Sequence, residues 1–352
     1  MCTGASGVHV ERSPHRHHLC NRRTLCNAVG CCSDLGGLQS SQVQRRQDLH
    51  RRRRRAQDIR RKVERSVLAN APPRAHVQLQ WKTIETARLE DLPCTCNGHV
   101  SNQAYARLLA AEIVPSDCDF AIYLDCDVIC LGDLWDLVDE ADKHSAVSAV
   151  PDGWGACVSW PDSSGVPMVF NYRELGIPAE ACYFNSGVLV LNMKVWREQN
   201  LGGQVIEYLQ RFRDNVVLWD QGGLNAVLHD SWFALDLRWN QMASVLYPNI
   251  AAWRAGDAQK WRSQFDRPFI IHYEGASKPW HVGARMPRMS HFFTYWKKTE
   301  FYPGRASWFV HLEWLIGSRM YNYIWNWRFL LGGLTKRYLK SENAQAGIQK
   351  QG

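Results

Sequence analysis

The residues best suited to chemistry are two carboxylates, Asp125 and Asp127, which stand inside the apolar run 120–130. In an extended chain the side chains of residues i and i+2 project to the same side. Two carboxylates held that close repel each other unless a cation lies between them, and a divalent cation with oxygen ligands meets this need. The alternative is a strand that simply ends in two solvated acids.

A nitrogen ligand for the same ion is available at His272, the last residue of the apolar run 268–272. Ligation by two oxygens and one nitrogen suits Mn²⁺ or Mg²⁺, and the imidazole favours manganese. Farther along, Gly275 permits close backbone approach, and Lys278 offers a point charge for a phosphate. A metal and a lysine together can neutralise the charge that develops on a departing diphosphate. Taken alone, His272 would more simply be a hydrogen-bonded core residue.

These residues need a sheet to hold them, and the pattern of the chain predicts one. Apolar or alternating runs predict strands at 77–81, 120–130, 145–150, 188–192, 232–237 and 268–272. Helical patterns fall between them, at 58–70, 101–114, 194–198, 205–212 and 220–228, and a further helix begins at Asp133. Strands that alternate with helices indicate an α/β fold. Ligands of open α/β sheets bind beyond the carboxyl ends of strands, where the two carboxylates would lie.

Composition places the chain among globular proteins, but its charge is uneven. The 352 residues suffice for one large or two modest domains. Residues 1–55 hold eleven Arg and three acids, so they carry the whole net charge of +8. The chain lacks an apolar run long enough to span a membrane and an apolar N-terminal signal. Its twelve cysteines are scattered, which suits free thiols better than a disulfide framework. Together these features predict a cytoplasmic protein.

Both ends of the chain differ from the middle. We expect residues 1–56, which are rich in Arg, Cys and His, to be disordered or aberrant. The run 51–55 could instead bind nucleic acid or anionic lipid, or the whole segment could come from a shifted reading frame. Residues 301–352 combine Trp, Tyr and Phe with Arg and Lys. They predict a peripheral membrane contact through 301–340, or aromatic packing on the domain or on a partner.

The middle of the chain resembles glycosyltransferase family 8 over roughly residues 57–300. The resemblance is carried by five motifs in order. They are Tyr-Ala-Arg (105–107), Tyr-Leu-Asp-Cys-Asp (123–127), Phe-Asn-Ser-Gly-Val-Leu-Val-Leu-Asn (184–192), Asp-Gln (220–221) and His-x-x-Gly-x-x-Lys-Pro-Trp (272–280). That family contains the retaining bacterial lipopolysaccharide galactosyl- and glucosyltransferases and the glycogenins.

The resemblance implies a type A glycosyltransferase fold, in which a mixed sheet flanked by helices binds a nucleotide sugar. It also implies a UDP-hexose donor (glucose or galactose), a glycan or glycolipid acceptor, and Mn²⁺ as cofactor with Mg²⁺ as the alternative. The implied metal ligands are Asp125, Asp127 and His272. The implied substrate-binding residues are Arg107, Asp125, Asp152, Asn185, Gly275 and Lys278. Asp220 and Gln221 would be catalytic, with Asp220 on sugar hydroxyls and Gln221 near the anomeric carbon.

Retention of the anomeric configuration constrains the mechanism that the resemblance implies. A double displacement needs a carboxylate nucleophile, and the family motif offers Gln221, which is a poor one. A front-face reaction is therefore expected, in which the acceptor hydroxyl enters on the side from which the diphosphate leaves.

The chain departs from the family at its front. The family begins with a strand and a loop carrying an Asp for the uridine, and residues 1–55 hold nothing similar. The first strand is therefore expected to be missing or corrupted. The leading prediction is a metal-dependent hexosyltransferase, and the alternative is a catalytically defective member that binds sugar nucleotide. A nucleic-acid-binding protein is a third, weaker interpretation, and no specific nucleic acid is expected.

Overall fold

The computed structural model describes residues 5–10, 42–72, 75–84, 89, 92–93, 102–153, 157–162, 164–242, 267–281, 284 and 286–302, with backbone alone in 5–10, 42–53 and 102–103. The strands are β1 (Ala5–Val10), β2 (Val77–Lys82), β3 (Phe120–Leu124), β4 (Val128–Cys130), β5 (Val147–Pro151), β6 (Phe184–Asn192), β7 (Trp232–Ala234), β8 (Gln241–Met242) and β9 (Ile270–His272). The helices are α1 (Gln42–Asn70), α2 (Ala110–Ile113), α3 (Leu134–Glu140), α4 (Met193–Glu198), α5 (Leu201–Arg211), α6 (Trp219–Val227), α8 (Met289–Trp296) and the 3₁₀ helices η2 (Asn102–Leu109) and η3 (Leu237–Asn240).

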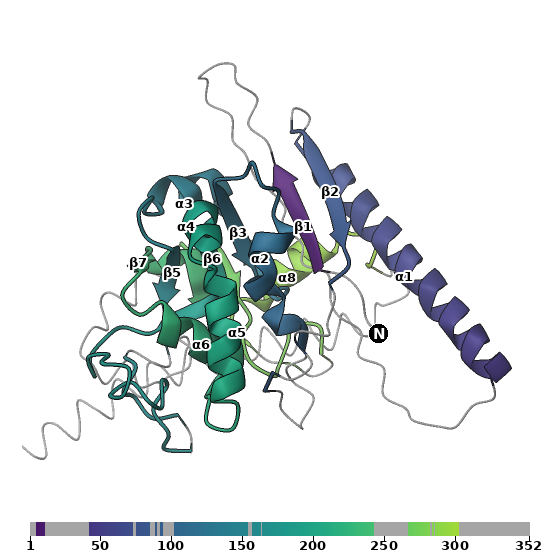
Figure 1. Ribbon diagram of the computed structural model, residues 1–352. Coiled ribbons are helices and arrows are strands. Elements are labelled where there is room, and N and C mark those ends of the chain that lie inside the picture. The colour runs from purple at the N-terminus through teal and green to yellow at the C-terminus, as the bar shows by residue number, and fades with distance from the viewer. Residues whose placement is uncertain are drawn as a thin grey trace, which may run out of the picture.

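A four-stranded mixed sheet in the order β3-β6-β5-β7 forms the centre of the fold (Figure 1). β6 runs antiparallel to both neighbours, and β5 pairs with β7 in parallel. The carboxyl ends of β3 and β5 therefore meet the amino end of β6 at one edge of the sheet. A shift of register between Ala149 and Val150 lies next to this edge, as bulges commonly do beside active sites.

The run 120–130, predicted to be one buried strand, is two strands in two sheets. β3 belongs to the central sheet, whereas β4 pairs antiparallel with β9 in a three-stranded sheet of order β4-β9-β8. The turn between them carries Asp125 and Asp127. The prediction of a continuous strand was wrong because the backbone must leave one sheet for the other at the carboxylates. β3 is also only half-buried.

β6 divides the core, because all nine of its residues are buried and alternate sides. Leu189 and Leu191 pack into the cluster formed with η2, α4, α5 and α6. Val188 and Val190 pack into the cluster formed with β4, β9 and η3. Figure 1 shows α5 and α6 covering the near face of the central sheet. β6 is thus held by apolar packing on both faces, and its amino end reaches the site edge.

The remaining predicted elements are found with small shifts. The strands predicted at 77–81, 145–150, 188–192, 232–237 and 268–272 appear as β2, β5, β6, β7 and β9. The helix predicted at 101–114 is mostly 3₁₀, since η2 precedes the short α2, and its residues Tyr105 and Leu108 are buried. The Asp133 side chain accepts from Trp135 N at 3.0 Å and so caps α3.

Two elements lie in the segment 1–56, which we expected to be disordered or aberrant. β1 pairs antiparallel with β2 in a sheet of its own, and α1 begins at Gln42. Residues 5–10 and 42–56 thus have regular backbone structure, and the expectation of a disordered or aberrant segment 1–56 stays a prediction. Residues 42–57 contain no Gly or Pro, and their Arg, Gln and Ala favour helix. The edge of β2 accepts a strand through backbone groups. Because β1 stands outside the central sheet, the missing family-type first strand remains a prediction.

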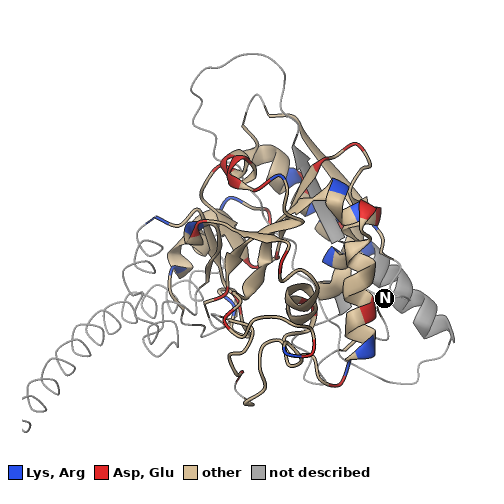
Figure 2. Ribbon diagram, turned by 60° about the vertical axis from the view of Figure 1, so that its left-hand side comes forward, with Lys and Arg blue, Asp and Glu red and all other residues tan. Residues whose placement is uncertain are grey.

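Residues 303–352 lie outside the described residues, and so does almost all of the predicted membrane-contact segment 301–340. Within the described part, none of the helices combines the length and apolar character needed to cross a bilayer. Figure 2 shows basic and acidic residues interspersed over the described elements.

Candidate active site

The edge where β3, β5 and β6 end collects the predicted site residues. Asp125 follows β3, and its backbone N–H donates to Gly187 O at 2.8 Å, which ties it to β6. Asp152 follows β5, and Asn185 lies near the start of β6. His272 ends β9, directly opposite Val128 in the antiparallel pair. The pairing of β9 with β4 in the three-stranded sheet thus places His272 next to Asp125 and Asp127, in the turn after β3.

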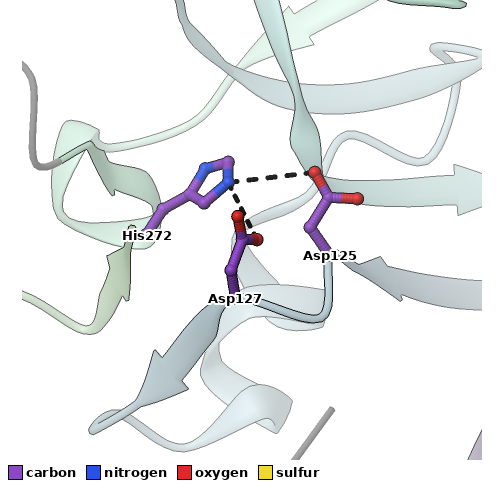
Figure 3. A group of neighbouring side chains, drawn as sticks. All are labelled: Asp125, Asp127 and His272. Atoms are coloured by element: carbon purple, nitrogen blue, oxygen red, sulfur yellow. Dashed lines mark ion pairs between the residues drawn. The ribbon is translucent and has the colours of Figure 1, made fainter. Parts of the chain in front are cut away.

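Asp125, Asp127 and His272 form a compact group whose ligand atoms all lie within 4.8 Å of one another. His272 Nε2 stands 3.3 Å from Asp127 Oδ1 and 3.8 Å from Asp125 Oδ2. Figure 3 shows the imidazole pointing one nitrogen at both carboxylates, from the opposite side of the group. The predicted metal-ligand set therefore comes together, although its members belong to two different sheets.

The chemistry of this group fits a divalent cation. Asp127 Oδ1 is buried and faces His272 Nε2 at 3.3 Å, but none of the described residues makes a hydrogen bond to it, and a buried oxygen without one is costly. Burial would raise the pKa of Asp127, but His272 and Lys278 hold it well below its ordinary value. Burial would lower the pKa of His272, yet Asp127 and then Asp125 raise it to about 9. The site therefore attracts positive charge strongly, and it holds two oxygens and one nitrogen for a metal.

Lys278 reaches the same carboxylate from the loop after β9. Its Nζ donates to Asp127 Oδ2 and, at 2.8 Å, to Tyr273 O. Between these residues Gly275 has a φ of +86° with nothing within 4 Å of an added Cβ, so glycine is needed there for the backbone conformation. Gly275 has no side chain that could contact Asp125, Asp127 or His272. Its role at the diphosphate remains a prediction.

Arg107, which is buried, bridges the carboxylates of Asp125 and Asp220. Its Nη2 donates to Asp125 Oδ1 at 2.7 Å, and its Nε lies 3.2 Å from Asp220 Oδ2. The guanidinium also donates to Ser186 O and stacks over the ring of Tyr123 at 4.2 Å. Burial would lower the pKa of Arg107, but Asp125 and Asp220 raise it instead, so the guanidinium stays charged.

Gln221 and Asp220 open helix α6 and are held by Ser186 of β6. The Ser186 backbone N–H donates to Gln221 Oε1 at 2.9 Å, and its hydroxyl donates to Asp220 Oδ2 at 3.2 Å. Burial raises the pKa of Asp220 against the effect of Arg107. Leu218 and Trp219, just before, both have positive φ, a strain that costs on the order of 1–3 kcal/mol per residue. This strained turn aims the pair at the site edge.

Asp152 and Asn185 lie next to Gln221 at the same edge of the sheet. Asp152 Oδ2 accepts from Gln221 Nε2 at 2.9 Å and from Asn185 Nδ2 at 3.1 Å. Asn185 Oδ1 accepts from Gly187 N at 2.9 Å and from Asn240 Nδ2 at 2.8 Å. Gln221 and Asn185 therefore both have their amides fixed within the protein. What they contact in a bound sugar remains a prediction.

Among the residues that hold this site together, Ser186, Gly187 and Asn240 were not identified from the sequence. Ser186 and Gly187 stand inside the motif that carries Asn185, so the motif itself was the signal. Asn240, fully buried at the end of η3, gave no such signal, because it stands between other polar residues, Arg238 and Gln241. Each of the three makes a hydrogen bond to a predicted site residue.

Curated relatives match over a little more than half of the chain. General stress protein A of Bacillus subtilis is 27% identical over 207 residues, which cover 58% of this chain and 68% of that protein. The lipopolysaccharide 1,2-glucosyltransferase of Escherichia coli is 29% identical over 59% of this chain and 57% of its own length. The lipopolysaccharide 1,3-galactosyltransferase of Salmonella typhimurium is 26% identical over 59% and 58%. The chain thus spans little more than half the length of the two lipopolysaccharide enzymes.

Solved structures share the fold. The galactosyltransferase LgtC, crystallised with donor and acceptor sugar analogues, aligns with a TM-score of 0.50 and 24% identity, covering 63% of this chain and 76% of LgtC. The expectation of a type A glycosyltransferase fold is confirmed. The model described as glycosyl transferase family 8 matches residues 53–284, more than half of the sequence. This chain therefore belongs to glycosyltransferase family 8 and is a glycosyltransferase.

Proposed function

We propose that this glycosyltransferase is a retaining hexosyltransferase that moves glucose or galactose from a UDP-sugar to a glycan or lipopolysaccharide-type acceptor. Its cofactor would be a divalent cation, Mn²⁺ in preference to Mg²⁺. The observation that carries the proposal is the group of Asp125, Asp127 and His272, with a buried oxygen on Asp127 to which none of the described residues makes a hydrogen bond. The acceptor class is supported by relatives that are named for lipopolysaccharide glucosyl and galactosyl transfer.

The metal side would bind the diphosphate of the donor. Asp125, Asp127 and His272 would hold the cation, which when bound supplies charge neutralisation for the leaving group. Lys278 lies against Asp127, near enough to turn its ammonium toward a phosphate oxygen. Gly275 would let the loop between His272 and Lys278 fold around the phosphates.

The sugar side would orient the hexose. Arg107 is anchored by two carboxylates, so its guanidinium would approach the donor with little loss of entropy. Asp152 and Asn185 would contact donor or acceptor hydroxyls, and Asp220 would bind sugar hydroxyls. Gln221 would lie near the anomeric carbon on the face opposite the leaving group.

Gln221 favours a front-face reaction over a double displacement. Both heteroatoms of its amide are hydrogen-bonded within the protein, and an amide oxygen is a poor nucleophile. In the proposed step the bond between the anomeric carbon and the diphosphate oxygen breaks, and the acceptor oxygen bonds to that carbon on the same face. The acceptor proton passes to an oxygen of the departing diphosphate. Gln221 would steady the oxocarbenium-like state.

A screen of UDP-sugars with Mn²⁺ tests this function. We expect UDP-glucose or UDP-galactose to be turned over, and NMR of the product to show the same anomeric configuration as the donor. Inverted product would contradict the front-face step. UDP binding without turnover of any hexose would favour the defective, sugar-nucleotide-binding member instead.

A further inference from the structure

Asn240 connects the metal side of the site to its sugar side. It ends helix η3 with 0% of its surface exposed. One end of its amide lies 2.9 Å from His272 Nδ1, and the other lies 2.8 Å from Asn185 Oδ1. Burying an amide is costly unless it is hydrogen-bonded, and both bonds of this amide go to predicted site residues.

The orientation of this amide follows from a neighbouring backbone group. The Gly187 N–H can only donate, so the Asn185 atom that it reaches at 2.9 Å must be the oxygen. Asp152 Oδ2, which faces the other end of the Asn185 amide at 3.1 Å, is a carboxylate oxygen and agrees with this. Asn185 Oδ1 accepts from Asn240, so Asn240 must turn its NH₂ group toward it.

The orientation of Asn240 in turn decides which nitrogen of His272 carries a proton. With its NH₂ group directed at Asn185, Asn240 presents its carbonyl oxygen to His272 Nδ1. That nitrogen must therefore carry a proton. In a neutral imidazole the lone pair then belongs to Nε2, the atom that lies 3.3 Å from Asp127 Oδ1. Gly187, Asn185 and Asn240 form a relay that fixes which nitrogen of His272 can bind a metal.

We infer that Asn240 is a positioning residue that holds the Nδ1–H tautomer of His272 and so directs Nε2 at a metal between Asp125 and Asp127. This inference rests on the proposed metal dependence. Hydrogen-bond partners of metal-binding histidines fix the ring and its tautomer, and their loss typically lowers metal affinity by about 10- to 100-fold. Asn240 also couples the metal ligand to Asp152 through Asn185.

Metal affinity of Asn240 variants tests this role without relying on turnover. The free Mn²⁺ signal in electron paramagnetic resonance, with excess UDP present, gives the affinity of each protein. We expect Asn240→Ala to bind Mn²⁺ about 10- to 100-fold more weakly. Asn240→Asp keeps an acceptor for the Nδ1–H and should recover most of the loss. Asn171→Ala removes another buried asparagine, which accepts from Tyr208, and should leave Mn²⁺ affinity unchanged.

A second measurement needs only the wild-type protein, so it holds even if Asn240→Ala does not fold. With ¹⁵N-labelled histidine and ¹¹³Cd²⁺, scalar coupling identifies the ligating nitrogen, and we expect it at Nε2 of His272. Coupling at Nδ1, or an Asn240→Ala protein with wild-type Mn²⁺ affinity, would overturn this inference alone. A wild type that binds neither metal would overturn the proposed metal dependence as well.

Discussion

Gly187 and His272 are packed so closely that no side chain fits between them. A Cβ on residue 187 would lie 2.3 Å from Cε1 and 2.8 Å from Nδ1 of the imidazole. The glycine of the Phe-Asn-Ser-Gly motif is therefore needed for the close approach of β6 to β9. Gly187 thus makes room for His272, a candidate metal ligand, although the same motif also carries Asn185.

Gly187→Ala should displace His272 and weaken metal binding. We expect Mn²⁺ affinity to fall at least about tenfold, with about 1–3 kcal/mol of destabilisation from overpacking. Titration calorimetry and denaturant unfolding measure the two effects. Gly203→Ala is the control, because the three atoms nearest to its Cβ would all belong to the side chain of Asn200, which can move. If Gly187→Ala binds Mn²⁺ like the wild type, the imidazole is not held as described.

Gly275 and Gly165 form a matched pair, since both have a φ of +86° and open space around an added Cβ. Each Gly→Ala change should cost about 1 kcal/mol or more of stability because a side chain is strained at this φ. Only Gly275→Ala should also weaken donor binding, because its loop leads to Lys278. The KM for the UDP-sugar and the Tm of both variants check this. Equal KM values for the two variants would remove Gly275 from the donor site.

Loss of Arg107 should leave two carboxylates without their shared partner. Breaking a buried ion pair costs about 3–5 kcal/mol, so we expect Arg107→Ala to be destabilised by roughly that amount. Arg107→Lys should recover only part of it, because an ammonium cannot bridge Asp125 and Asp220 as a guanidinium does. Urea unfolding measures both variants. Arg61→Ala removes an exposed pair with Asp58 and should change stability by less than about 0.5 kcal/mol; if Arg107→Ala is no worse than this, the ion-pair assignment is wrong.

The residues of the site were largely predictable from sequence, whereas their supports were not. Asp125, Asp127 and His272 were recognisable because carboxylates and histidine interrupt or end apolar runs, and the family motifs added Arg107. The break between β3 and β4 was not recognisable, because which sheet a strand joins depends on partners far away in the chain. The sequence of residues 120–130 predicts one strand. In the structure its first part pairs with β6 and its last part pairs with β9.

Backbone strain and buried hydrogen-bond relays also cannot be predicted from sequence patterns, because both depend on residues that are distant in the chain. Leu218 and Trp219 adopt positive φ, which no bulky residue favours by itself, so packing around α6 must impose it. Asn240 reads as an ordinary polar residue after Trp239, and its role depends on His272 and Asn185, which come from two other elements. Local propensity carries none of this information.

Gln221→Ala should slow transfer without trapping a sugar on the enzyme. In a front-face reaction the amide only stabilises charge, so we expect turnover to fall on the order of a hundredfold. Intact-protein mass spectrometry during turnover should find no glycosylated side chain in either protein. Gln204→Ala, an exposed glutamine on α5, should behave as the wild type. A covalent hexose adduct on the wild-type enzyme would contradict the front-face account.

The most direct test of the central claim is the rate of hexose release from UDP-glucose and UDP-galactose, with and without Mn²⁺, in the wild type and in Asp127→Asn. Asparagine keeps the size of the side chain but loses the charge that a cation needs. We predict turnover that requires Mn²⁺, stops with a chelator, and falls by at least about a hundredfold in Asp127→Asn. Equal rates in the two proteins, or full wild-type turnover in the presence of chelator, would contradict the account.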